Sequence, residues 1–289
     1  MTVALHTNLA DTPETAPLPP PRLERVDGVA RVSVKAAGDG ATRLAGLHQS
    51  GAAKVRLPRV VAGAPLEAVF LNTAGGVTAG DRLRYEVVSA EGAQVVATSQ
   101  AAERAYRALN GTARIEAELT VSSGARLDWI PQETILFEGS RLRRRFTVDL
   151  ADDAVFLAAE MVVLGRTAMG EVLHDITFLD SWRVRRSGAL VFADATRIDG
   201  DADAIMTVGA TGNRAIAFAT VVFVAPDTEG QLAGVRDALE PVPAEWGASA
   251  WNGVLVVRMV AASAQPLRDA LITAIETLRG AGMPRVWHC

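Results

Sequence analysis

The chain has 289 residues, of which 49% are hydrophobic, and it carries a formal net charge of −4 with a pI near 5.7. This length and composition allow one large domain or two small ones with a substantial core, and the acidic balance gives no electrostatic case for nucleic-acid binding. Cys289 is the only cysteine, which excludes an internal disulfide and leaves no Cys/His cluster for structural zinc.

No segment of the sequence has the pattern of a secretory signal or of a membrane-spanning helix. The N-terminus lacks the basic head and apolar core of a secretory leader. The longest largely apolar run, residues 215–225, is far shorter than the roughly 20 residues of a membrane helix. We therefore expect a soluble cytoplasmic protein with no membrane partner.

The first part of the chain predicts a tail followed by a β-sheet body. Residues 1–24 are rich in Pro, Thr and Ala and are expected to form a disordered or loosely docked tail. From Arg25 onward, polar and apolar residues alternate with the period of two that is typical of strands. Predicted strands lie at 26–34, 82–88, 113–121 and 143–148, and Gly or Asp turns separate them. Turns this frequent predict a mainly β fold over residues 25–212, as stacked sheets, a barrel or a β-helix-like body.

Helical patterns appear only near the end of the chain. Strands are predicted at 216–224 and 254–260, and helices at 228–239 and 266–278. Pro266 suits a first helical position and Gly280 a helix stop. Residues 213–289 are therefore expected to form a small α+β layer of the same domain, with two C-terminal helices.

A glycine-rich turn follows the apolar run 68–71. Residues 71–81 read LNTAGGVTAGD, so Gly75, Gly76 and Gly80 lie within six residues. No Gly-Lys-Ser/Thr follows, as a phosphate-binding loop would require, and the next residues alternate like a strand. We interpret the segment as a crowded turn between two strands, closed by Asp81.

This turn and several later blocks resemble the urease accessory protein D family (UreD, also called UreH). The blocks are ATSQAAERAYRA at 97–108, DWIPQETILFEGSRLRRR at 128–145, AEMVVLGRTAMGE at 159–171, DSWRVRRSGALVFAD at 180–194 and MPRVWHC at 283–289. The resemblance spans roughly residues 25–289. It implies a mostly β, helix-poor fold of stacked sheets with two helices near the end.

The resemblance also implies a function. Members of that family are urease maturation chaperones without enzymatic activity. The implied partners are the urease apoprotein and accessory protein F, which recruits the GTPase, accessory protein G, that brings nickel. The implied task is to dock this complex and to help insert nickel, and the interior of the protein is one route that nickel could take. No tightly bound cofactor is expected, only transient nickel(II).

Polar groups within the resembling blocks are the candidates for a nickel path. Glu133 and Glu160 are embedded in apolar runs, where a carboxylate is costly unless it is paired, hydrated or used. His174 is the one imidazole beside carboxylates, and imidazole suits nickel well. The candidate set is Asp81, Glu133, Glu160, Glu171, His174 and Asp175.

Other readings of the same residues remain open. Glu160 could form a structural ion pair, for instance with Arg166, and the chain could be a plain β-sheet adaptor with no metal role. It could also be a small-molecule hydrolase that uses Asp81 and Glu133 as an acid/base pair, although no catalytic motif is present. His288 and Cys289 could bind a soft metal at the chain end, where defined sites are rare.

Overall fold

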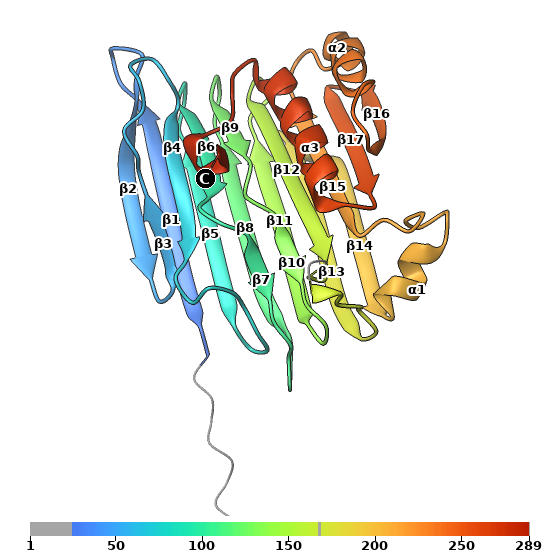
Figure 1. The fold of residues 1–289 in the computed structure, drawn as a ribbon. Coiled ribbons are helices and arrows are strands. Elements are labelled where there is room, and N and C mark those ends of the chain that lie inside the picture. Colours follow the sequence, from blue (N-terminus) through green and yellow to red (C-terminus); the bar gives the residue numbers. More distant parts are fainter. Residues whose placement is uncertain (1–24, 167–168, 289) are drawn as a thin grey trace, which may run out of the picture.

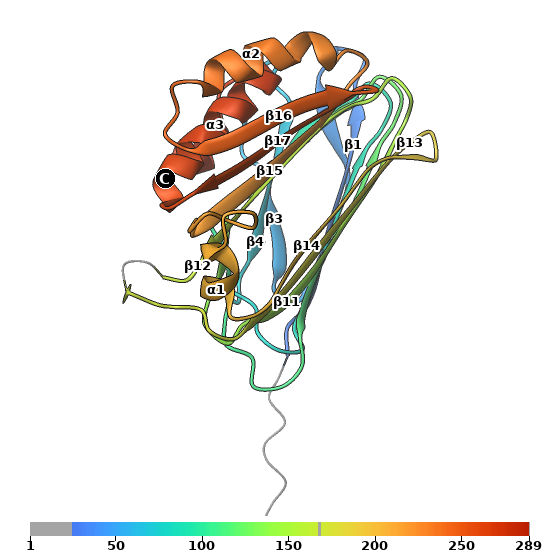
Figure 2. The same ribbon diagram turned by 90° about the vertical axis from the view of Figure 1, so that its right-hand side faces the viewer.

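The computed structural model describes residues 25–166 and 169–288. The predicted tail at 1–24 and Cys289 lie outside the described residues. The fold is mainly β, as the alternation predicts, with two large sheets stacked face to face (Figures 1 and 2).

Sheet A has seven strands, and parallel pairs run through its centre. In spatial order the strands are β14 (Ala189–Gly200), β13 (Ile176–Arg186), β11 (Arg141–Leu150), β8 (Ala113–Val121), β5 (Arg82–Ser89), β1 (Asp27–Ala36) and β2 (Thr42–Ser50).

Sheet B has ten strands. Its main path is β16 (Glu245–Trp251), β17 (Val254–Ala261), β15 (Ala217–Val224), β12 (Val155–Leu164), β9 (Arg126–Trp129), β6 (Gln94–Ser99), β4 (Leu66–Asn72) and β3 (Ala53–Arg56). The short strand β10 (Thr134–Leu136) pairs with β12 and with β7 (Glu103–Ala105).

The middle of the chain winds between the two sheets. It passes from β5 to β6, from β8 to β9 and from β11 to β12, and each step crosses from sheet A to sheet B. Successive strands of one sheet therefore lie parallel, like the turns of a β-solenoid. This confirms the predicted β-helix-like body. The C-terminal strands β15, β17 and β16 continue sheet B and do not form a sheet of their own.

Two of the helices lie on sheet B, and the short α1 (Ala202–Thr207) contacts β14 of sheet A. The two on sheet B are α2 (Glu229–Leu239) and α3 (Ala264–Arg279), followed by a 3-10 helix at Arg285–His288. Helices α2 and α3 cover the outer face of sheet B at β15, β16 and β17, and no described helix covers the outer face of sheet A (Figure 2). None of the helices in the described part of the chain is long and apolar enough to cross a membrane.

Two hydrophobic cores follow from this layering. One fills the space between the sheets, and its fully buried members include Leu83, Leu119 and Phe156. The other lies between sheet B and the helices, where Leu271 and Trp287 are buried. The inner face of sheet B therefore belongs to one core and its outer face to the other.

The helix predictions hold with small shifts. Thr228 precedes α2, and Gly280 ends α3 in the left-handed conformation with φ 64°. Helix α3 begins at Ala264, so Pro266 occupies the third helical position instead of the first. That position still needs no intrahelical donor, because the first four N–H groups of a helix have no partner within it.

The glycine turn is as crowded as its sequence predicts. Gly75 and Gly80 have φ of 78° and 86°, a region that L side chains rarely adopt. A Cβ on Gly76 would lie 2.3 Å from Cε2 of Tyr106 and 2.6 Å from the carbonyl oxygen of Arg104. Position 76 therefore requires glycine, because the segment that contains Arg104 and Tyr106 approaches it closely.

Candidate functional site

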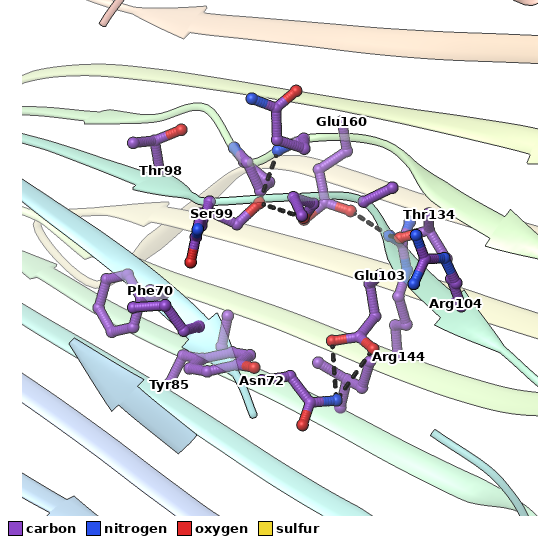
Figure 3. A pocket seen from close by; sticks show the side chains of 18 of the residues that line it. Phe70, Asn72, Tyr85, Thr98, Ser99, Glu103, Arg104, Thr134, Arg144 and Glu160 are labelled. Carbon is purple, nitrogen blue, oxygen red and sulfur yellow. Dashed lines mark hydrogen bonds and ion pairs between the residues drawn. The ribbon is translucent and has the colours of Figure 1, made fainter. Parts of the chain in front are cut away.

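A cavity of about 410 Å³ lies between the two sheets, with lining from strands of both (Figure 3). Aromatic side chains form part of its wall, namely Phe70, Tyr85, Trp129 and Phe146. The polar lining residues are Asn72, Thr73, Thr98, Ser99, Gln100, Glu103, Arg104, Gln132, Thr134, Arg144, Arg145, Glu160 and Asp180. Gly75 and Ala101 also line it and are exposed, so the cavity reaches the surface beside the glycine turn.

Three charged side chains of the cavity lining are joined by ion pairs. Arg144 lies on β11, Asp180 on β13 and Glu160 on β12 of the opposite sheet. The register of β11 and β13 places Arg144 directly beside Asp180, and Nη2 of Arg144 donates to Oδ2 of Asp180 at 2.5 Å. Nη1 of the same guanidinium is ion-paired with Glu160. We call Arg144, Glu160 and Asp180 the charged trio.

Neighbouring donors hold the two carboxylates in place. Nε1 of Trp129 donates to Glu160 at 3.1 Å, and Nε1 of Trp182 donates to Asp180 at 3.1 Å. Oδ1 of Asp180 and Nε of Arg144 are buried without a hydrogen-bond partner among the described residues. The trio therefore keeps capacity to bind a further polar group.

The trio carries more negative than positive charge when both carboxyls are ionised. Burial raises the pKa of Glu160, against the attraction of Arg144, and the charge of Asp180 raises it further. Burial works against the charge on Arg144, but Asp180 and Glu160 outweigh it, so the pKa of Arg144 lies above its usual range. An added proton or cation would balance the excess charge.

A third carboxyl group, that of Glu103 on β7, also lines the cavity. Nδ2 of Asn72 donates to Oε1 and Oε2 of Glu103 at 3.0 and 3.3 Å (Figure 3). Burial raises the pKa of Glu103 to about 7, although the bond from Asn72 opposes this shift. Glu103 therefore exchanges its proton near neutral pH.

The end of the chain closes one wall of the cavity from outside. Nε1 of Trp287 donates to Oγ1 of Thr98 at 3.1 Å and to the carbonyl of Ile130 at 3.2 Å. The side chain of Gln132, which also lines the cavity, donates to the carbonyl of Val286 at 3.1 Å. The guanidinium of Arg268 lies over the Trp287 ring, 4.5 Å from its centroid. The 3-10 helix is thus anchored directly to cavity residues.

The six residues predicted for a nickel path do not gather at one place. Only Glu160 lines the cavity. Asp81 is buried, but its carboxylate accepts from the backbone N–H of Val26 at 2.9 Å and of Thr78 at 2.8 Å, which fixes the glycine turn. Glu133 forms an ion pair with Arg268 at 2.8 Å on the helix side of sheet B.

The other three candidates lie near the loop that follows β12. Glu171 pairs with Arg166, and Asp175 pairs with Arg141 at 2.6 Å. Nδ1 of His174 lies 3.5 Å from Asp201, with the imidazole largely exposed. Within the described ranges, no group of three or more His, Cys, Asp or Glu side chains could hold a metal ion.

These contacts show that two expectations from the sequence were wrong. The partner of Glu160 is Arg144 and not Arg166, which pairs with Glu171. Asp81 and Glu133 hold separate partners, so they do not make the acid/base pair that a hydrolase would need.

Sequence reasoning missed Glu103, Arg144 and Asp180 as cavity residues. A signal was present for two of them, because residues at even spacing on a strand share a face. Arg144 lies between Leu142 and Phe146, and Asp180 lies between Phe178 and Trp182 at the same spacing, all buried. These patterns place both charges on the inner face of sheet A.

Comparison with known proteins identifies relatives over almost the whole chain. A model of the family described as UreD urease accessory protein matches residues 26–288. The urease accessory protein UreD of Dinoroseobacter shibae is 49% identical over 269 residues, which cover 93% of this chain and 94% of that protein. Urease accessory protein UreD 2 of Methylorubrum populi is 46% identical over 278 residues, 94% of each chain. The UreD protein of Azorhizobium caulinodans is 44% identical over 270 residues, 92% of this chain and 98% of that protein.

Proposed function

The chain belongs to the UreD family of urease accessory proteins, which are non-catalytic, and on that premise we propose that it acts in urease maturation. In this proposal it docks accessory protein F on apo-urease, and through F the GTPase, accessory protein G. It then helps nickel reach the urease active site. The family match over residues 26–288 is the observation that carries the proposal.

We further propose that nickel crosses the protein through the cavity between the sheets. The cavity supports this step because it reaches the surface and because the trio lies in its otherwise largely apolar wall. The trio carries a net negative charge when both carboxyls are ionised. Glu103 adds a carboxyl whose proton a divalent cation can displace near neutral pH. Few protein ligands at any one point give weak binding, which suits a cargo that must move on.

The test replaces a cavity carboxylate without removing its hydrogen-bond acceptor. In Glu160→Gln, the amide oxygen can still accept from Trp129, and Arg144 keeps Asp180 as its partner. The matched control is Glu133→Gln, which also removes one partner of an arginine ion pair but lies outside the cavity lining.

Each variant is co-expressed with the urease operon, and the nickel content of purified urease is measured beside the yield of co-purified accessory proteins. We expect Glu160→Gln to lower nickel content while assembly stays intact, and Glu133→Gln to leave both unchanged. Full nickel loading with Glu160→Gln would leave the chain as a docking adaptor only. Normal urease activation after deletion of the whole gene would overturn the maturation role itself.

A further inference from the structure

Three arginines stand side by side on the outer face of sheet A. Arg82 on β5 is the register partner of Arg114 on β8, which is the register partner of Arg143 on β11. All three side chains are exposed. Neighbouring strands lie about 4.8 Å apart, so the outermost two are separated by roughly 10 Å at the backbone. We call these three residues the arginine row.

The side chains of the arginine row have no ion-pair or hydrogen-bond partner among the residues that the structure describes. Asp27 is the register partner of Arg82 on its other side, yet no ion pair joins them. The next row across the same strands is Arg84, Glu116 and Arg145, where Glu116 pairs with both arginines at 3.2 and 3.0 Å. The two rows therefore differ in that the arginines of the second row are ion-paired and those of the arginine row are not.

Such a row costs stability in the isolated chain. Like charges directly opposite each other on neighbouring strands are destabilising. A hollow of about 300 Å³ lies beside the row and is lined by Arg82, Arg84 and Arg114 together with Asp27 and Glu116. No described helix covers this face of sheet A (Figure 2). This part of the outer face is therefore exposed to solvent, contains a hollow and carries three positive charges in a line.

We infer that the arginine row docks an acidic α-helix of another component of the urease assembly, an inference that rests on the proposed function. A helix lying across the strands places carboxylates at i, i+4 and i+7 on one face, spread over about 10.5 Å along its axis. Adjacent members of that set are about 5–6 Å apart at Cβ, which is close to the strand spacing. Each carboxylate can then bind one guanidinium through two parallel hydrogen bonds.

The surroundings of the row favour a short acidic helix over an extended polyanion. Glu116 and Glu118 on β8, and Glu86 on β5, lie in the next rows and would repel a phosphate backbone that ran past the arginines. The chain as a whole carries a net charge of −4. A single small anion would meet one or two of the three guanidiniums and leave the row unbalanced.

The test measures binding of purified accessory protein F, accessory protein G and apo-urease, separately and together, to the wild-type chain and three variants. Arg114→Glu reverses the central charge. Arg114→Lys keeps that charge but loses the planar two-bonded geometry. Lys35→Glu is the matched control, because it makes the same charge change at an exposed position near the other end of β1.

We expect Arg114→Glu to weaken binding of one component at least about tenfold at low salt, with a smaller difference at high salt. Arg114→Lys should lose less, and Lys35→Glu should bind within about twofold of wild type. Because Arg114→Glu relieves the like-charge row, its melting temperature should equal or exceed that of the wild type. A photoreactive residue at Leu179, the register partner of Arg143, should cross-link to an acidic helix of that component.

Equal binding of Arg114→Glu and Lys35→Glu to every component would overturn the inference and leave the proposed function standing. A cross-link to residues 1–24 of the same chain would also overturn it, because the chain would then cover its own row. If the wild-type chain binds none of the components, the proposed function fails and the inference fails with it.

Discussion

Glu103→Gln tests whether burial makes the ionised form of the Glu103 carboxyl unfavourable in the folded protein. In the wild type, Asn72 donates to both carboxylate oxygens, and an amide oxygen can still accept from it in the variant. The substitution therefore removes the charge and keeps the shape and one hydrogen bond. Any change in stability then reports on the cost of ionising this group in the fold.

The magnitude follows from the pKa of Glu103, which burial raises from the ordinary 4.5 to about 7. Below the unfolded pKa, both states are protonated and ionisation costs nothing. As the pH rises from 4.5 through 7, the unfolded state loses its proton first, so the folded state loses stability. The full difference corresponds to about 3 kcal/mol of unfolding free energy above pH 7, as an upper bound.

We therefore expect Glu103→Gln to be more stable than the wild type at pH 8 by about 1–3 kcal/mol, with the gain vanishing toward pH 4.5. Urea unfolding of both proteins across this pH range measures the difference. Glu91→Gln, at an exposed turn carboxyl, is the control and should show no such pH-dependent gain. A constant difference between pH 4.5 and 8, or a loss of stability at pH 8, would refute the burial argument.

Two further predictions concern the supports of the cavity. Gly76→Val should lower the melting temperature more than Gly80→Val, because a Cβ at 76 meets Tyr106 at 2.3 Å, whereas at 80 the nearest atoms, on Arg25, lie 3.4 Å away. Both should still cost about 1–3 kcal/mol, so a wild-type melting temperature in either variant contradicts this account. Trp287→Ala should destabilise by about 3–5 kcal/mol through the lost packing, while Trp251→Ala, at an exposed tryptophan, should cost far less in the same urea titration.

Strand alternation predicted the body of the fold because most strands bury one face. The predicted strand at 113–121 coincides with β8, and those at 82–88 and 254–260 are each within one residue of β5 and β17. Strand β2 escaped prediction for the opposite reason. Its residues are exposed or half-buried throughout, including Leu44 and Leu47, so no face of it shows an apolar pattern.

The candidate site was less predictable, because it depends on contacts between sheets. The sequence shows that Glu160 lies in an apolar run, but its partner Arg144 comes from another strand of the other sheet. Local reasoning favoured Arg166, which is closer in sequence and pairs elsewhere. Spacing along one strand predicts which face a charge occupies, but it does not predict which charge lies opposite.

The charged trio also bears on why the cavity exists. Stability alone does not favour buried ion pairs, because apolar replacements of similar volume are often neutral or stabilising. Three charges on three separate strands therefore need another reason to lie between the sheets. The partnerless atoms of Asp180 and Arg144, the two carboxyls that share one guanidinium and the adjoining carboxyl of Glu103 together supply such a reason. They describe a charged group inside a fold whose inward positions are mostly apolar, and the proposed route for a cation needs such a group.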